Sequence, residues 1–182
     1  MASGMGMPSM GIYSYELFKF YDVDTIIRIG SAGTISDKVD LRDIVLAMGT
    51  CTDSNYAMQY RLPGLYAPIA DFGLLHTAYE QAGLYGIWTE VGNVVSTDVF
   101  YNDNTEYNKS WSKMNVLAVE MESAALYMNA ARLSKRALAM FTISDNLLNG
   151  GSLSVKERQE GFDDMIKLSL ETAVLSYVQG GK

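Results

Sequence analysis

The sequence contains little of several residue types that mark particular protein classes. A single cysteine, Cys51, excludes an internal disulfide framework and suits a reducing compartment. The chain has no apolar run of about 18 residues and no basic segment leading into an apolar one, so neither a membrane span nor a signal peptide is expected. Basic residues (14) are outnumbered by acidic ones (21), and the net charge of −7 argues against a nucleic-acid-binding surface. We therefore expect a cytoplasmic protein with neither a membrane nor a nucleic acid as partner.

What is present is enough apolar sequence for one substantial core. The 182 residues are 48% hydrophobic, which favours a single domain over residues 1–182. Apolar segments predict strands at 25–29, 41–52, 89–95, 116–119 and 137–144, and helical spacing predicts helices between them, beginning with one from about Pro8. This alternation predicts an α/β fold with a central mixed, largely parallel sheet flanked by helices on both faces.

The two ends of the chain carry distinctive helix signals. A glycine-rich loop at residues 3–6 leads into the first helix, although such a loop normally follows a strand, so we expect the fold to be truncated at the N-terminus with an exposed sheet edge. Near the other end, Ser154 and Glu157 form a capping-box pattern that predicts one continuous helix over 155–178. Its expected buried stripe is Phe162, Met165, Ile166, Leu170, Ala173, Val174 and Tyr177.

Polar residues follow three of the predicted strands. Arg28 precedes a glycine turn, and a guanidinium beside turn amides suits an anion. Glu120 and Glu122 follow the 116–119 strand, where carboxylates could accept from a diol. Asp145 follows the buried run 138–143, where it could donate a proton. Because ligands bind outside the carboxyl ends of parallel strands, we expect anion, diol and proton donor to meet in one pocket.

Each of these features also has a structural explanation. An arginine in a strand is commonly an ion-pair partner, and two glutamates before a helix are commonly partners of its dipole. Asp145 followed by Asn146 could form a turn or a helix cap. Taken one at a time the three features decide nothing, so the order of motifs along the chain carries the argument.

That order resembles the hexameric bacterial-type purine nucleoside phosphorylases of the nucleoside phosphorylase superfamily. The matching segments are SGMGMPS, IIRIGSAG, LRDIVLAMGTCTDS, VGNVVSTDVFYN, VEMES, TISDN and KERQEGFDDMIK. The resemblance implies the nucleoside phosphorylase fold and a homo-oligomer, a hexamer by likeness to the family. It implies cleavage of the N-glycosidic bond of purine (deoxy)ribonucleosides by inorganic phosphate, giving the free base and (deoxy)ribose 1-phosphate. Phosphate is the co-substrate, and no metal or organic cofactor is implied.

The resemblance also implies roles for individual residues. Phosphate would be bound by the strand-end residues Arg28, Ile29, Gly30 and Ser31. The nucleoside would be bound by Met5, Phe100, Glu120, Met121, Glu122 and Ser144. Within that set Met5 lies against the sugar, Phe100 packs on the purine, and Glu122 accepts from the ribose hydroxyls. The catalytic residues would be Asp145, which protonates the base at N7, and Arg158, which positions that aspartate.

Two departures from the family pattern leave alternatives open. Family members carry a longer N-terminal segment, including a phosphate-clamping arginine and residues given to a neighbouring subunit, and this sequence shows no counterpart. Asn146 also stands where many members have histidine. The alternatives are a nucleoside-binding or inactive truncated homologue, and a related purine nucleosidase that uses water.

Overall fold

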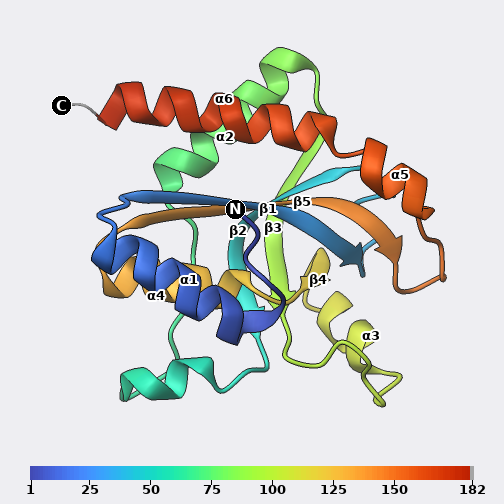
Figure 1. Ribbon diagram of the computed structural model, residues 1–182. Helices are drawn as coiled ribbons and strands as arrows, with labels where there is room; N and C mark the ends of the chain where they lie inside the picture. Colours follow the sequence, from blue (N-terminus) through green and yellow to red (C-terminus); the bar gives the residue numbers. More distant parts are fainter. Residues whose placement is uncertain (181–182) are drawn as a thin grey trace.

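The computed structural model describes residues 1–180, and residues 181–182 of the expected domain lie outside this part (Figure 1). The strands are β1 (Thr25–Thr34), β2 (Ile44–Thr52), β3 (Thr89–Ser96), β4 (Ala118–Glu120) and β5 (Arg136–Asn146). The helices are α1 (Gly6–Phe20), the 3₁₀ helix η1 (Tyr56–Tyr60), α2 (Phe72–Tyr85), α3 (Tyr107–Ser112), α4 (Ser123–Arg132), α5 (Val155–Glu160) and α6 (Asp163–Gly180). None of the helices described is both long and apolar enough to cross a membrane.

The five strands close into a barrel in the order β1-β4-β3-β2-β5, and β5 pairs back to β1. β1 and β5 run parallel to each other, as do β2, β3 and β4, and the two groups meet in antiparallel seams at β1–β4 and β2–β5. The prediction of a mixed, largely parallel sheet is therefore confirmed. Every described strand has two strand neighbours, but β1 pairs with β4 only at Gly33 and Thr34. Among the described residues, the side of β1 opposite β5 therefore has no strand partner over residues 25–32, and the expected open sheet edge lies there.

Helices cover the sheet from two sides. α2 packs against α6 on one side, and α1 packs against α4 on the opposite side (Figure 1). Local sequence fixes several of the helix ends: the Asp71 side chain accepts from Leu74 N at 2.9 Å to start α2, and Gly86 ends it in the left-handed conformation at φ 67°. Helices flanking the sheet on both sides were predicted from the alternation of elements, and this prediction is confirmed.

The N-terminal loop has the geometry that its glycines allow. Gly4 and Gly6 take φ values of 71° and 82°, in the left-handed region that side-chain-bearing residues rarely enter. Met5 between them is extended and serves as the N-cap position of α1 without a capping side chain of its own. The first amide of α1 is therefore free to donate outside its helix.

Strand β1 is longer than the sequence predicted and contains no glycine turn. It pairs in parallel with β5 from Thr25 to Thr34, with one irregularity between Ala32 and Gly33. The backbone at residues 30–31 is therefore part of the sheet rather than a turn of free amides, and that prediction is wrong. Gly30 leaves room for the side chain of Arg28, because a Cβ at this position would lie 2.7 Å from Nη1.

The C-terminal helix is divided in two, contrary to the prediction of one continuous helix. The chain turns after α5 so tightly that a Cβ on Gly161 would lie 2.5 Å from the carbonyl oxygen of Glu157. The predicted buried stripe is also wrong beyond Met165 and the half-buried Phe162, because α6 buries Met165, Leu168, Ser169, Thr172 and Ser176 and exposes Ile166, Leu170, Ala173, Val174 and Tyr177. Hydroxyls of Ser169 and Thr172 donate to carbonyls of their own helix, so their burial costs little.

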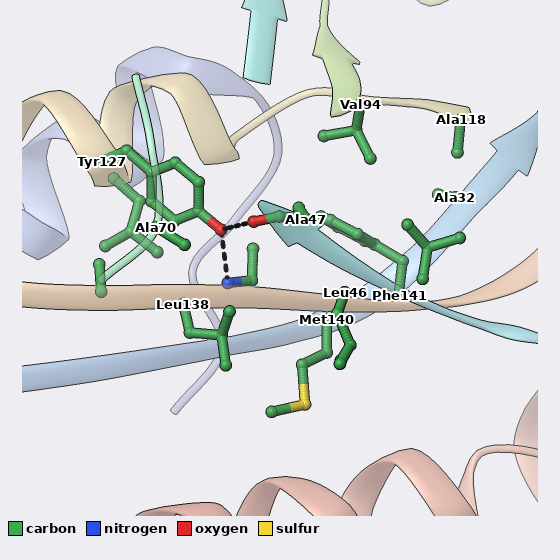
Figure 2. Packing of buried hydrophobic residues seen from close by; sticks show 14 of the residues in the cluster. Ala32, Leu46, Ala47, Ala70, Val94, Ala118, Tyr127, Leu138, Met140 and Phe141 are labelled. Atoms are coloured by element: carbon green, nitrogen blue, oxygen red, sulfur yellow. Dashed lines mark hydrogen bonds between the residues drawn. The ribbon is translucent and has the colours of Figure 1, made fainter. Parts of the chain in front are cut away.

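A buried tyrosine completes the seam between β2 and β5. The ladder pairs Leu46 with Met140, and the next pair in register is Ala47 and Ala139. Instead of bonding directly, these two residues share the hydroxyl of Tyr127, which donates to Ala47 O at 2.6 Å and accepts from Ala139 N at 2.9 Å (Figure 2). Burial raises the pKa of Tyr127, so the hydroxyl keeps its proton and its role as donor.

Tyr127→Phe should therefore destabilise the fold although it removes one atom. The substitution leaves a buried carbonyl and a buried amide without a partner, which we expect to lower the free energy of unfolding by about 2–4 kcal/mol. Tyr177→Phe is the matched control, because Tyr177 is 86% exposed and should lose nothing measurable. Chemical denaturation measures both variants, and equal stability of the two would show that the seam does not depend on the hydroxyl.

Candidate active site

The sheet register brings polar residues of different strands to one level of the barrel. Ser96 pairs with Glu120 across β3 and β4. Gly33 of β1 pairs with Val119 on one side and with Asp145 on the other. The ends of β4 and β5 are thus two interstrand spacings apart, roughly 10 Å. They do not share one carboxyl edge as predicted, since β4 runs antiparallel to β1 and β5.

Glu120 lies at the end of β4 and is only 4% exposed. Its carboxylate accepts from the amides of Glu122 at 2.9 Å and Ser123 at 3.0 Å, and from the hydroxyl of Ser96. Burial raises the pKa of Glu120, while Arg28 and these hydrogen bonds act against that rise. The carboxylate therefore holds the first turn of α4, which is the structural role that a glutamate before a helix often has.

Glu122 faces the N-terminus of α1 as well as that of α4. It is 6% exposed, and its Oε1 accepts from Gly6 N at 2.7 Å, while its Oε2 accepts from Nη2 of Arg28. The negative charge thus lies against the positive end of a 15-residue helix and beside a guanidinium. These contacts join β1, the glycine-rich loop and the 120–122 segment, which are far apart in the sequence.

Arg28 is mostly buried between these carboxylates and the core. Its Cζ lies 4.8 Å from the centroid of the Phe141 ring, and its Nη1 lies 3.9 Å from Oε2 of Glu120. Nε and Nη1 are buried without a hydrogen-bond partner among the described residues. Buried donors are rarely left unpaired, so the N–H groups on these two nitrogens are available to an acceptor that the described residues do not supply.

Asp145 is the centre of a second group. Its Oδ1 accepts from Nη2 of Arg158 at 2.8 Å, and its Oδ2 accepts from the hydroxyl of Ser144 at 2.7 Å. Arg158 is fixed in turn, because its Nε donates to Leu153 O at 3.1 Å and because its helix, α5, begins with the predicted capping box. The side chain of Asp145 remains 31% exposed, so one side of it is open to a ligand.

The remaining predicted site residues lie at the surface of the same region. Met5 (85% exposed) adjoins Gly6, and Phe100 (74% exposed) lies on the segment between β3 and α3, with its ring centroid 4.9 Å from that of Tyr101. Ile29 is 40% exposed, Ser31 is exposed, and Met121 is half-buried. The structure therefore brings Arg28, Glu120 and Glu122 into contact and leaves the side chains of Met5 and Phe100 open to solvent.

Sequence reasoning missed Ser96 and Phe141. The Ser96 hydroxyl contacts Glu120, accepts from Ala124 N at 2.9 Å and lies 3.0 Å from the hydroxyl of Thr50. Ser96 ends an apolar strand just as Glu120 does, so the same signal of a polar residue after a strand would have found it. No local signal marks Phe141, because its position beside Arg28 comes from the pairing of β1 with β5.

Neither group has the composition of a metal centre. Among the residues that the structure describes, no three or more His, Cys, Asp and Glu side chains are grouped so that they could hold a metal ion. The chemistry that the site offers is that of a guanidinium with two free donors, a pair of buried carboxylates and an accessible aspartate paired with an arginine.

Comparison with known proteins agrees with the resemblance seen in the motifs. The family model described as the phosphorylase superfamily matches residues 1–178. A DeoD-type purine nucleoside phosphorylase of Geobacillus sp. (strain WCH70) is 46% identical over 172 residues, which cover 94% of this chain and 73% of that protein. The protein of the same name from Limosilactobacillus reuteri (strain DSM 20016) is 48% identical over 173 residues, again 94% and 73% of the two chains. This chain belongs to the phosphorylase superfamily.

Proposed function

We propose that this chain cleaves the N-glycosidic bond of purine (deoxy)ribonucleosides with inorganic phosphate, releasing the free base and (deoxy)ribose 1-phosphate. Relatives that are 46–48% identical over 94% of the chain carry the name purine nucleoside phosphorylase. The observation in the structure that carries the proposal is the pair of buried, unpaired donors on Arg28 directly beside Glu120 and Glu122. Donors for an anion and acceptors for hydroxyls are what a phosphate attacking a ribose requires.

The phosphate end of the site is formed by β1. Nε and Nη1 of Arg28 are offered to phosphate oxygens, and residues 29–31 extend the strand past the guanidinium. Gly30 leaves space for the arginine to lie along its own strand, which holds the guanidinium in place before phosphate arrives. The negative charges of Glu120 and Glu122 keep this guanidinium paired when phosphate is not bound.

The sugar end is formed by the 120–122 segment. We assign Glu122 as the acceptor for the ribose hydroxyls, with Met121 and Met5 against the sugar. Glu122 already accepts from Gly6 N and from Arg28, so its orientation is fixed by two elements before a nucleoside binds. Glu120 acts through Glu122, because it bonds the backbone amide of that residue at 2.9 Å.

The leaving group is activated by Asp145. When the bond between C1′ and the purine nitrogen breaks, its electron pair goes to the base while a phosphate oxygen bonds to C1′. We assign Asp145, in its protonated form, as the donor of a proton to N7, which makes the base a better leaving group. Ser144 and Arg158 hold the carboxyl group in position, and Phe100 packs on the purine.

Dependence on phosphate is the decisive test. Inosine and adenosine should each yield free base and pentose 1-phosphate in phosphate buffer and no free base when phosphate is omitted, as measured by chromatography. Equal base release without phosphate would assign the chain to the purine nucleosidases. Nucleoside binding without base release in either buffer would assign it as a non-catalytic binding protein.

We further propose that the protein acts in the cytoplasm as a homo-oligomer with no cofactor besides the co-substrate phosphate. The support for an oligomer is a set of exposed apolar side chains on and after η1, namely Met58 at 73%, Leu62 at 49% and Ile69 at 64%. Clustered exposed apolar residues are typical of protein interfaces. Cys51 has no second cysteine with which to pair, which suits a reducing compartment.

A further inference from the structure

The segment at residues 97–106, here called the base-side loop, joins β3 to α3 and carries Phe100. Its side chains are mostly exposed, and Phe100 itself is 74% exposed. Few packing contacts can therefore fix where the Phe100 ring stands. A freely moving loop loses conformational entropy when a ligand orders it, and this loss weakens binding. A loop that presents an aromatic ring to a ligand therefore binds better when another contact already restrains it.

A single carboxylate oxygen joins both ends of this loop. Oδ2 of Asp53 accepts from the hydroxyl of Thr97 at 2.9 Å and from the hydroxyl of Tyr107 at 2.7 Å. Thr97 is the first residue of the loop, and Tyr107 is the residue directly after it. Burial, with Asp53 as a lesser cause, raises the pKa of Tyr107, so its hydroxyl remains a donor. The Thr97 hydroxyl also accepts from Val99 N at 3.2 Å, next to Phe100.

Asp53 is itself held on the frame of the sheet. It follows Thr52, the last residue of β2, whose hydroxyl donates to Ser96 O at 2.8 Å. On the other side, Thr97 N donates to the carbonyl of Glu120 at 2.9 Å. The carboxylate of Asp53 is therefore one residue away from a strand end that is bonded to β3, and the loop start is bonded to the segment that carries Glu122.

The loop faces the beginning of α1 across a cavity of about 430 Å³. Met7 and Pro8 of α1 line one part of it, Asp98 and Val99 of the loop line another, and the remaining lining residues are Asp53, Ser54, Asn55 and Tyr56. Gly6, next to Met7, donates to Glu122. The position of the base-side loop thus sets the distance from the part of the loop that carries Phe100 to the start of α1, where Gly6 contacts Glu122.

We propose that Asp53 is a positioning residue that holds the base-side loop, and with it Phe100, at the correct distance from the sugar-binding carboxylate. The proposal rests on the proposed function, since it assumes that Phe100 contacts the purine. Asp53 does not contact the reacting atoms; it acts through Thr97 and Tyr107. Its effect belongs to nucleoside binding and not to phosphate binding, because Arg28 makes no contact with this loop in the hydrogen bonds and ion pairs described.

Asp53→Ala should raise the KM for inosine or adenosine about 3- to 10-fold, leave the KM for phosphate unchanged and change kcat little. The effect is modest because Asp53 is exposed and water competes for its hydrogen bonds. Asp53→Asn should restore the nucleoside KM, since the amide oxygen can still accept from both hydroxyls. As a single variant, Tyr107→Phe should also raise the nucleoside KM. Combined with Asp53→Ala, it should raise that KM little further, because both substitutions remove the same hydrogen bond. Asp103→Ala, an exposed acid within the same loop, is the matched control and should resemble the parent chain.

Several outcomes would overturn the proposal. These are an unchanged nucleoside KM in Asp53→Ala, equal rises in both KM values, or failure of Asp53→Asn to rescue. If the parent chain releases no base, the proposed function fails. The role of Asp53 is then tested by measuring inosine binding by calorimetry and hydrogen exchange of residues 97–107 in the parent chain and in Asp53→Ala. Weaker inosine binding together with faster exchange in Asp53→Ala would then support the positioning role. Unchanged values, or no inosine binding by the parent chain, would remove it.

Discussion

Asp145→Asn should lower the rate of phosphorolysis of inosine or adenosine by about 10²–10⁴. The substitution keeps the size of the side chain and leaves one oxygen to accept from Nη2 of Arg158, which lies at 2.8 Å from Oδ1. The hydroxyl of Ser144, which lies at 2.7 Å from Oδ2, can turn to accept from the new amide nitrogen, but the acidic proton that the base must receive is lost. A nucleoside whose base already carries a positive charge, such as 7-methylguanosine, leaves without N7 protonation and should lose far less. The measurement is kcat/KM for both substrates in both proteins.

The difference between the two substrates carries the test. Asp37→Asn, at an exposed position outside the site, is the matched control for loss of one charge and should change neither rate. Equal losses on the neutral and the cationic nucleoside would mean that Asp145 shapes the pocket without donating a proton. The role assigned to Arg158 would then have to be abandoned as well, because Arg158 is assigned only as the residue that positions this proton donor.

Arg28→Met should lower the free energy of unfolding by about 3–5 kcal/mol, because it leaves two buried carboxylates without their guanidinium. For a chain of this size that corresponds to a fall of roughly 6–20 °C in melting temperature. Arg132→Met, at an exposed position, is the matched control and should be close to neutral. We expect phosphate to raise the melting temperature of the parent chain, because it binds to the native state. Arg28→Met should lose this stabilisation by phosphate.

The loss caused by Arg28→Met should depend on pH. Burial holds the pKa of Glu120 above its ordinary value of 4.5, so between the two values the folded chain binds more protons than the unfolded chain and stability falls as pH rises. Arg28 is the largest cause that lowers the pKa of Glu120. Without Arg28 this pKa rises further, so the pH range over which stability falls extends to higher pH. The variant should therefore be closer to the parent chain at pH 5 than at pH 8. A stability difference independent of pH would show that Glu120 is not the group left uncompensated.

The local elements of this protein could be predicted from the sequence because their causes lie within a few residues. Ser154 with Glu157 starts α5 as the capping-box pattern predicted, and the Asp71 cap and the left-handed Gly86 that bound α2 are equally local. Apolar runs predict β2, β3 and β5 for the same reason. The order of the motifs SGMG, VEMES and TISDN was enough to predict the family, and the family model matches residues 1–178.

Other features depended on where distant segments meet, which no local pattern contains. The hydrogen bond from Gly6 to Glu122 joins residues 116 positions apart, and the bond from Arg28 to Glu122 joins residues 94 apart. Parallel pairing with β5 extends β1 through residues 30–32, so a segment that reads as a glycine turn became strand. Packing against neighbouring elements likewise decides which face of α6 is buried. Ser169 and Thr172 can be buried because their hydroxyls donate to carbonyls of their own helix, while larger apolar residues of α6 remain exposed.

The sequence by itself thus determined the strands β2, β3 and β5, the cap of α5 and the identity of the polar residues that end the strands. Only the tertiary structure decided that Arg28 is held by the carboxylates of Glu120 and Glu122, and that Asp53 joins both ends of the loop bearing Phe100. The physical reason is range. Backbone hydrogen bonding and side-chain periodicity act over a few residues, whereas the pairing of buried charges depends on the direction and register of strands that the whole chain must assemble.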